Sequence, residues 1–264
     1  MARRRVLTIA GSDSGGGAGI QADLKTIAAL GGFGMTAITA VTVQNTKGVA
    51  GVEQLSPETV GAQIRAVASD IGVDAAKTGM LASARIVTAV AEAVREAAIS
   101  LLVVDPVFMS NHGHPLLADD AVGALRGELF PLATLVTPNL LEAAELVGFR
   151  VDSRDAMRRA GAALLGDGPS AVLVKGGHLD EDDAADLLVD AEGEEWLEHR
   201  RIDTPHTHGT GCVLSAAVAT YLAGGVGLRP AVRDAKRFVT AAIAHALALG
   251  QGIGPVDPLW DRTA

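Results

Sequence analysis

The sequence contains a single cysteine, Cys212, and no apolar run long enough to span a membrane. One cysteine excludes an intramolecular disulfide and a cysteine-rich zinc site, and it is typical of the reducing cytoplasm. Gly, Thr, Gln or charged residues interrupt each apolar stretch before it reaches the ~20 residues of a membrane span. The run at residues 6–10 is also too short for a signal peptide. We therefore expect a cytoplasmic protein with no membrane partner.

Positive charge and aromatic residues are scarce as well. The 22 Lys and Arg residues are outnumbered by 31 Asp and Glu residues, and aromatics make up only 3% of the chain. The net charge of −9 argues against a nucleic-acid partner, since Arg3-Arg4-Arg5 is too short a basic stretch to offset it. Ala, Val and Leu must therefore build the core, and the 264 residues allow one large domain or two small ones.

Short apolar strands alternate regularly with helical segments. The strands are expected at residues 6–10, 35–43, 73–77, 101–104, 135–137 and 171–175. The helices are expected at residues 20–30, 57–70, 83–97, 119–127, 140–147, 153–165 and 229–249, with one more that begins at 209–212. Residues 185–189 and 195–200 flank Ala191-Glu192-Gly193 and predict a hairpin.

This alternation predicts the fold class. It is typical of an α/β protein with a doubly wound, mainly parallel central sheet flanked by helices. The hairpin would add a small antiparallel pair at an edge. We expect residues 1–264 to form one domain, because no linker, low-complexity tract or internal repeat divides the chain.

Polar or glycine-rich residues follow each predicted strand. They are Gly11 to Asp13, Gln44 and Asn45, Thr78 to Met80, Asp105, Asn139, and Lys175 to His178. In open α/β sheets, ligands bind beyond the carboxyl ends of the strands. The sequence therefore predicts a binding site at this edge of the sheet.

The stretch His208-Gly209-Thr210-Gly211-Cys212 precedes an apolar helical run. Its two glycines permit a tight turn and a close approach to a ligand. A helix start offers unpaired N–H groups and a positive dipole end, which together favour an anion. The alternative is a glycine-rich turn with a cysteine packed as a small apolar residue.

Two carboxylates and two lysines are candidates for phosphate chemistry. Asp105 and Glu142 have the ligand type that Mg²⁺ prefers. Asp105 also fits a simple Asp-Pro turn, and Glu142 fits a capping box with Asn139 or a solvated helix face. Lys175 precedes two glycines and is expected near a nucleotide phosphate, as is Lys236, for which a surface position is the alternative.

Three further residues suit a small aromatic ligand. Gln44 offers a donor and an acceptor to a flat heterocycle. Met80 fits either the face of a ring or the core. Asp23 is expected to receive a ligand hydroxyl or to lie in solvent near its helix start. Together with the helix start and the lysines, these residues indicate phosphoryl transfer, although the sequence lacks the Gly-x-x-x-x-Gly-Lys-Ser/Thr motif of Walker-type sites.

A nicotinamide-dependent oxidoreductase is the weakest alternative. Gly17, Gly19 and Ala22 form a Gly-x-Gly-x-x-Ala pattern after the first strand. Dinucleotide sites also need an acidic ribose ligand at the end of the second strand. That strand ends in Gln44-Asn45-Thr46 here, so the pattern fails its context.

Seven motifs occur along the chain in one characteristic order. They are residues 11–23 (GSDSGGGAGIQAD), 41–46 (VTVQNT), 77–80 (KTGM), 105–107 (DPV), 137–143 (TPNLLEA), 175–178 (KGGH) and 208–212 (HGTGC). In this set and order the sequence resembles the hydroxymethylpyrimidine/phosphomethylpyrimidine kinases of thiamine biosynthesis, which have the ribokinase-like fold.

The resemblance implies a phosphotransferase that uses ATP and Mg²⁺. Its substrates would be 4-amino-5-hydroxymethyl-2-methylpyrimidine and then the monophosphate of that pyrimidine, and it would be a homodimer. The implied roles are pyrimidine contacts by Asp23, Gln44, Met80 and Val107; magnesium and phosphate contacts by Asp105, Asn139 and Glu142; ATP contacts by Lys175 and Lys236; and an anion hole formed by Gly209, Thr210, Gly211 and Cys212.

The sequence departs from related patterns at several positions. Cys212 stands where ribokinase-like sugar kinases carry an Asp base, and a helix start is expected to lower the pKa of this thiol. We expect Cys212 mainly to complete the anion site and to accept the alcohol proton late. Val43 and Val213 replace the Ala and Thr of the family pattern, and Val43 is expected to crowd the pyrimidine pocket. The segment 108–115 lacks the lysine expected in a lid.

Two alternatives to the pyrimidine kinase stay open. A pyridoxal or pyridoxine kinase has the same fold, although the absence of a second cysteine weakens the version that captures an aldehyde. A non-catalytic pyrimidine sensor is the other, and the presence of Asp105, Glu142, Lys175 and Cys212 together argues against it.

Overall fold

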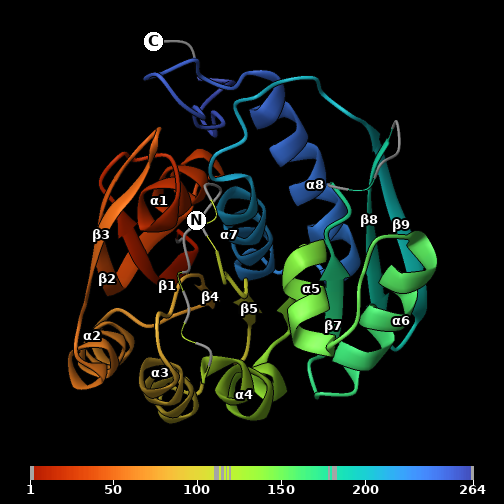
Figure 1. The fold of residues 1–264 in the computed structure, drawn as a ribbon. Coiled ribbons are helices and arrows are strands. Elements are labelled where there is room, and N and C mark those ends of the chain that lie inside the picture. Colours follow the sequence, from red (N-terminus) through yellow and green to blue (C-terminus); the bar gives the residue numbers. More distant parts are fainter. Residues whose placement is uncertain are drawn as a thin grey trace.

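One nine-stranded sheet runs through the molecule (Figure 1). The computed structural model describes residues 3–109, 113, 116, 118, 120–177, 179 and 183–262. The strands are β1 (Arg5–Asp13), β2 (Phe33–Asn45), β3 (Gly48–Gln54), β4 (Ala75–Thr78), β5 (Leu102–Val104), β6 (Leu135–Val136), β7 (Ala171–Val174), β8 (Asp183–Asp190) and β9 (Gly193–Arg200). Their order across the sheet is β3-β2-β1-β4-β5-β6-β7-β8-β9.

The six central strands, in the order β2-β1-β4-β5-β6-β7, are parallel to one another. At the edges, β3 pairs antiparallel with β2, and β8 and β9 continue antiparallel from β7. The sequence predicts the β8–β9 hairpin, and the doubly wound fold class is confirmed. The sequence does not predict β3, which pairs with β2 at the opposite edge of the sheet. Two glycines and a central alanine interrupt the apolar alternation of β3, so the usual strand signal is missing there.

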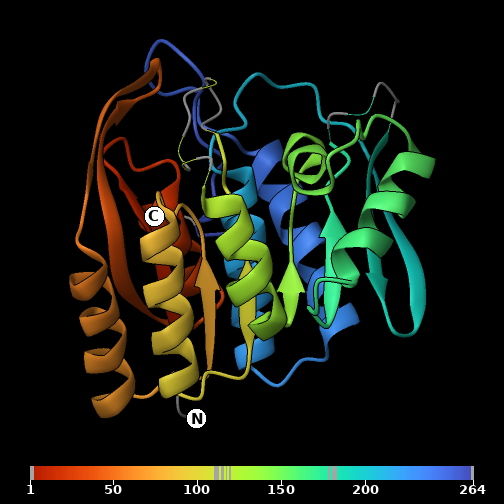
Figure 2. The same cartoon turned by 60° about the horizontal axis from the view of Figure 1, so that its bottom comes forward.

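Helices cover both faces of the sheet. One face carries α1 (Gly19–Ala29), α7 (Thr210–Ala223) and α8 (Leu228–Ala244). The other carries α2 (Pro57–Asp70), α3 (Ala84–Glu96), the short α4 (Ala121–Ala124), α5 (Leu140–Val147) and α6 (Arg154–Leu165). In Figure 2 the orange to green helices lie in front of the sheet and the blue helices lie behind it.

The last helix ends five residues before the sequence predicts. After Ala244 the chain turns back, and the Leu247 N–H donates to the Pro255 carbonyl. The part of the chain that the structure describes contains no helix of the length and apolar character that a membrane crossing requires.

The central strands are buried on both faces, which explains their continuous apolar runs. In β7, Ala171 and Leu173 pack against α7 and α8, whereas Val172 and Val174 point into the core beneath α5 and α6. All four are fully buried. Because the strands are parallel, their carboxyl ends meet at one edge of the sheet.

Candidate active site

A cavity of about 560 Å³ opens at the edge where the parallel strands end. Its wall combines the loop after β1, the end of β2, the turns after β4 to β7, the start of α7, and residues of β9 and α8. Apart from Asp23, every residue to which the resemblance assigns a role lies on this wall: Gln44, Met80, Asp105, Val107, Asn139, Glu142, Lys175, Gly209, Thr210, Gly211, Cys212 and Lys236.

The start of α7 lies at the centre of the cavity. Gly209 has φ +84°, and a Cβ there would lie 1.9 Å from the Gly17 carbonyl oxygen, so only glycine fits. A Cβ on Gly211 would lie 3.3 Å from Lys175 Nζ and 3.4 Å from an Asp105 oxygen. The backbone of the helix start therefore approaches both the glycine loop after β1 and a lysine–carboxylate cluster.

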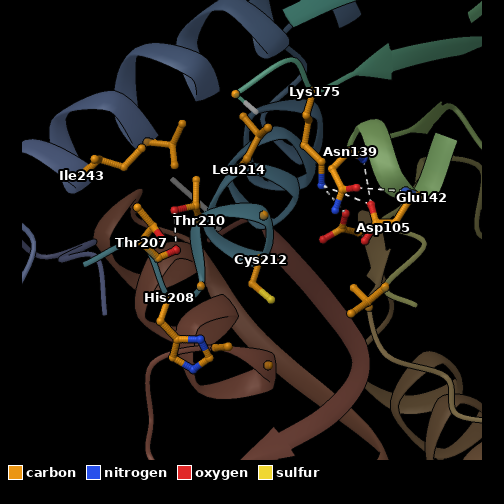
Figure 3. A pocket seen from close by; sticks show the side chains of 18 of the residues that line it. Asp105, Asn139, Glu142, Lys175, Thr207, His208, Thr210, Cys212, Leu214 and Ile243 are labelled. Carbon is orange, nitrogen blue, oxygen red and sulfur yellow. Dashed lines mark hydrogen bonds and ion pairs between the residues drawn. The ribbon is translucent and has the colours of Figure 1, made fainter. Parts of the chain in front are cut away.

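That cluster consists of Asp105, Glu142 and Lys175 (Figure 3). Lys175 Nζ lies 2.9 Å from Asp105 Oδ1 and 3.9 Å from Glu142 Oε2. Thr137 donates to the same Asp105 oxygen at 3.0 Å. Both carboxyl groups are buried, so two acidic groups share one lysine at the cavity wall.

The two carboxylates differ in protonation. Burial raises the pKa of Asp105, but Lys175 and Lys77 outweigh it and the pKa lies below its ordinary value. Burial raises the pKa of Glu142 to about 7 despite Lys175. A divalent cation held between them would replace the missing positive charge, and one or two carboxylates are what Mg²⁺ uses alongside phosphate and water. No cluster of three metal-ligating side chains occurs among the described residues.

Asn139 and Glu142 form a capping box at the start of α5. The Glu142 N–H donates to Asn139 Oδ1 at 2.9 Å, and the Asn139 N–H donates to Glu142 Oε2 at 2.8 Å. The capping interpretation is confirmed, and it does not compete with the metal interpretation. The cap holds the Glu142 carboxylate at the cavity beside Lys175.

Cys212 lies in the first turn of α7, between the cluster and His208 (Figure 3). Its pKa is raised to about 11, chiefly by burial, although Lys77 opposes the shift. The expectation that the helix start lowers this pKa is wrong, because burial outweighs the nearby positive charge of Lys77. The side chain is therefore a thiol near neutral pH.

Asp23 does not reach the cavity wall. Its carboxylate is fully buried beneath it, where Lys77 Nζ donates at 3.0 Å and Thr8 donates at 2.6 Å. No role for Lys77 is predicted from the sequence. A single lysine within the buried strand Ala75–Thr78 nevertheless indicates a buried carboxylate partner, because buried charges are normally paired.

The expected ring contacts lie on one side of the cavity. Met80 and Val107 line it with Gln44. Val43 points away from the cavity, because successive residues of a strand point to opposite faces and the next residue, Gln44, lines the cavity. Val43 is accordingly 64% exposed. The expectation that Val43 crowds the pocket is therefore wrong. Val213 is fully buried in the core rather than near the cavity.

Lys236 is buried on α8, so the surface alternative is wrong. Its Nζ donates to Asp186 at 2.7 Å and to the Ala184 carbonyl at 3.2 Å. Asp186 also accepts from the Gly176 N–H at 2.9 Å. This link ties α8 to the glycine turn that follows Lys175, although sequence analysis gave Asp186 no role.

Asp13 and His208 form a buried pair that joins distant parts of the chain. His208 Nε2 lies 2.9 Å from Asp13 Oδ2. The same carboxylate accepts N–H bonds from Gly15, Gly17 and Ala18. The sequence places Asp13 and His208 within motifs but cannot pair residues 195 positions apart.

The predicted lid lies largely outside the described residues. Ser110 to His112, His114 and Pro115 of this lid are not among the described residues. His178, which follows the turn after Lys175, also lies outside them.

Comparison with known proteins identifies one family. The sequence model described as phosphomethylpyrimidine kinase matches residues 13–257. A hydroxymethylpyrimidine/phosphomethylpyrimidine kinase of Streptomyces coelicolor is 56% identical over 255 residues, which cover 97% of this chain and 94% of that protein.

Solved structures agree with this result. An ADP complex of Bacillus subtilis pyridoxal kinase has a TM-score of 0.93 and 40% identity, with both chains fully covered. A phosphomethylpyrimidine kinase of Clostridium difficile has a TM-score of 0.81 and 44% identity, covering 91% of this chain and all of that one. From the family model and the high identity to the Streptomyces coelicolor relative, the chain thus belongs to the phosphomethylpyrimidine kinase family and is a phosphotransferase.

Proposed function

We propose that this enzyme transfers the γ-phosphoryl group of ATP to 4-amino-5-hydroxymethyl-2-methylpyrimidine and then phosphorylates the monophosphate to the diphosphate, in thiamine biosynthesis. The observation that carries the proposal is the arrangement of Asp105, Glu142 and Lys175 against the start of α7. The high identity to a relative named for both steps supports the substrate.

The site would act by positioning and by charge. The N–H groups at the start of α7 face the position of the transferred phosphoryl group and stabilise the charge that develops there. Lys175 lies beside them, while Lys236 fixes the glycine turn through Asp186. A loose phosphoryl-transfer transition state needs little proton removal early on, which fits a protonated Cys212.

The residues present suit a magnesium ion bound together with the nucleotide. Asp105 and Glu142 would hold it, directly or through water, and Asn139 keeps Glu142 in place. The ion would neutralise phosphate charge at the cluster.

The acceptor would lie against Gln44, Met80 and Val107, on the side of the cavity away from Lys236. Asp23 is proposed to act from beneath this side, through Lys77, rather than by touching the ring. We also propose that residues 1–264 form one domain and that the chain is a homodimer, as the resemblance implies.

Pyridoxine phosphorylation is the second candidate. It is favoured by the likeness to Bacillus subtilis pyridoxal kinase over the whole chain. The two rings are similar in size, so both would fit beside Met80, and the polar groups around Gln44 must distinguish them.

Coupled ADP release with Mg-ATP tests the proposal. The assay compares the hydroxymethylpyrimidine, its monophosphate and pyridoxine. Turnover of both pyrimidines with pyridoxine far behind is the expected result. Turnover of pyridoxine alone would replace the proposal with the second candidate, and no turnover of any of the three would leave the pyrimidine sensor.

A further inference from the structure

Gln44 is held between two polar groups at the end of β2. Its Nε2 is placed 3.2 Å from His208 Nε2, and its Oε1 lies 3.2 Å from Thr42 Oγ1. The two orientations of a glutamine amide differ only by the exchange of O and N, and the neighbouring donors and acceptors decide between them. Figure 3 shows the His208 ring beside the start of α7, apart from the Asp105–Lys175 cluster.

Asp13 decides which atom of His208 carries hydrogen. The Asp13 carboxylate lies 2.9 Å from His208 Nε2 and accepts backbone N–H bonds from Gly15, Gly17 and Ala18. Burial raises the pKa of Asp13, but His208 and these N–H groups outweigh it and the pKa is lowered. An ionised carboxylate accepts only. His208 must therefore carry a hydrogen on Nε2, whether the ring is neutral or charged.

A hydrogen on Nε2 is incompatible with an amide N–H₂ group facing it at 3.2 Å, because both groups would be donors. A carbonyl oxygen at that position accepts a share of the same hydrogen. At the other end, Thr42 Oγ1 lies 3.0 Å from the Ser12 carbonyl and gives its only hydrogen there. The hydroxyl is then free to accept an N–H from Gln44.

We infer that the Asp13–His208 pair turns the amide of Gln44 so that its oxygen faces His208 and its nitrogen faces Thr42. The edge between the two atoms keeps one lone pair and one N–H hydrogen for the cavity that Gln44 lines. His208 is thus a positioning residue that sets the order of donor and acceptor offered to a ligand.

An amide edge that is held fixed favours a ring that offers the complementary acceptor and donor side by side. The ring nitrogen and adjacent amino group of a 4-aminopyrimidine form an acceptor–donor edge that pairs with a fixed amide in two places. The ring nitrogen of pyridoxine has no amino neighbour and takes one hydrogen bond at most. A site built for both bonds rejects the ring that lacks one of them. The inference rests on the proposed function, in which Gln44 contacts the pyrimidine.

The glycine loop explains why His208 holds this position. A Cβ on Gly17 would lie 2.5 Å from His208 Cδ2, so the ring packs directly on the backbone of that loop. The His208 N–H donates to the Gly254 carbonyl at 3.1 Å, and its carbonyl accepts from the Val256 N–H at 3.1 Å. The Gly17 backbone on one side and the backbone bonds to Gly254 and Val256 on the other therefore restrict movement of the His208 ring, so Gln44 must adapt to His208.

The test compares His208→Leu, which removes the donor, with His208→Gln, which keeps an N–H near the same place. For His208→Leu we expect kcat/KM on the hydroxymethylpyrimidine to fall at least about tenfold, mostly through KM, with pyridoxine changed by less than about threefold. His208→Gln should restore most of the discrimination. In a Gln44→Met background, His208→Leu should have little further effect on the ratio of the two substrates.

Other outcomes separate the inference from the proposed function. An equal fall of kcat on both substrates, or an unchanged substrate ratio, would overturn the role of His208 while leaving the pyrimidine kinase intact. Wild-type enzyme that turns over neither pyrimidine would overturn the function itself. If His208→Leu does not fold, ¹⁵N spectra of the wild-type histidine still decide, since an unprotonated Nε2 at neutral pH would refute the inference.

Discussion

At the scale of single residues, the balance between burial and neighbouring charges decides the protonation of the site more than residue type does. Glu142 and Asp105 are both carboxylates near Lys175, yet their pKa values shift in opposite directions. Cys212 begins a helix, yet its pKa is raised to about 11. Two expected outcomes follow from these shifts.

Cys212→Ala is expected to lower kcat about tenfold, and Cys212→Ser by less. Alanine removes the sulfur from the cavity wall, whereas serine keeps a polar atom there, and in both variants the backbone N–H groups of α7 that we propose to face the phosphoryl group remain. Steady-state kinetics with saturating ATP measure the effect. Unchanged turnover would remove any catalytic role of the thiol, whereas a loss beyond about 1,000-fold would make the sulfur the essential base.

Glu142 gives the stability of the protein a defined pH dependence. Its pKa rises from 4.5 to about 7 on folding, so between these values the native state binds a proton that the unfolded chain has lost. The free energy of unfolding should therefore fall as pH rises through this window, by roughly 1–3 kcal/mol. Urea unfolding at pH 5 and pH 8, without nucleotide, measures it.

Glu142→Gln is the matched control, because glutamine keeps the shape but does not titrate. The difference between wild type and this variant should carry the predicted fall. Identical pH dependence in both proteins would show that Glu142 has no raised pKa.

At the scale of elements, caps and close approaches place the reactive groups. The capping box of α5 holds Glu142, and the contact of Gly209 with Gly17 docks α7 on the loop after β1. The buried Lys236–Asp186 pair fixes α8 to β8. The last two contacts connect elements that are distant along the chain.

Asn139 permits a test that separates capping from ligand binding. Asn139→Ala should destabilise the protein by about 1 kcal/mol, because the Glu142 N–H loses its acceptor, and Asn139→Ser should recover most of this. Thermal unfolding measures both. Both variants lack the side-chain amide, so a rise of the KM for ATP in both would show that this amide contacts phosphate. An unchanged KM in both would confine Asn139 to capping.

At the scale of the whole molecule, the two sheet edges differ. The β8–β9 edge is bound to α8 by the Arg229 and Arg233 ion pairs with Asp190 and Glu195. On β2, near the other edge, Val41 and Val43 are 46% and 64% exposed and face away from the cavity. An apolar pair on a strand surface suits the proposed homodimer.

Val43→Glu is expected to convert the homodimer to a monomer at micromolar concentration. In a symmetric interface the introduced carboxylates of the two subunits would be buried close to each other, with no positive charge to pair with either. Light scattering after size exclusion gives the mass, with Val43→Thr as the control of similar shape. A monomeric wild type would end the homodimer proposal, and a dimeric Val43→Glu variant would move the interface to another surface.

The sequence by itself determined the parallel sheet, the edge of the sheet where the cavity opens and most of the residues on the cavity wall. These features follow from local pattern: apolar runs give buried strands, glycines give turns, and polar residues mark the strand ends from Asp105 to Lys175. The family resemblance then gave the activity. Strand β3 is not predicted from the sequence, because its glycines and alanine interrupt the apolar alternation that indicates a strand.

Only the tertiary structure decided the partners and the protonation of these residues. The Lys77–Asp23 and Lys236–Asp186 pairs, and the Asp13–His208–Gln44 contacts, join positions 50 or more residues apart. Burial depends on how the layers pack, so the raised pKa of Cys212 cannot be read from neighbouring residues in the sequence. Local pattern fixes which groups reach the edge of the sheet, whereas packing fixes their distances, and their charge states depend on those distances.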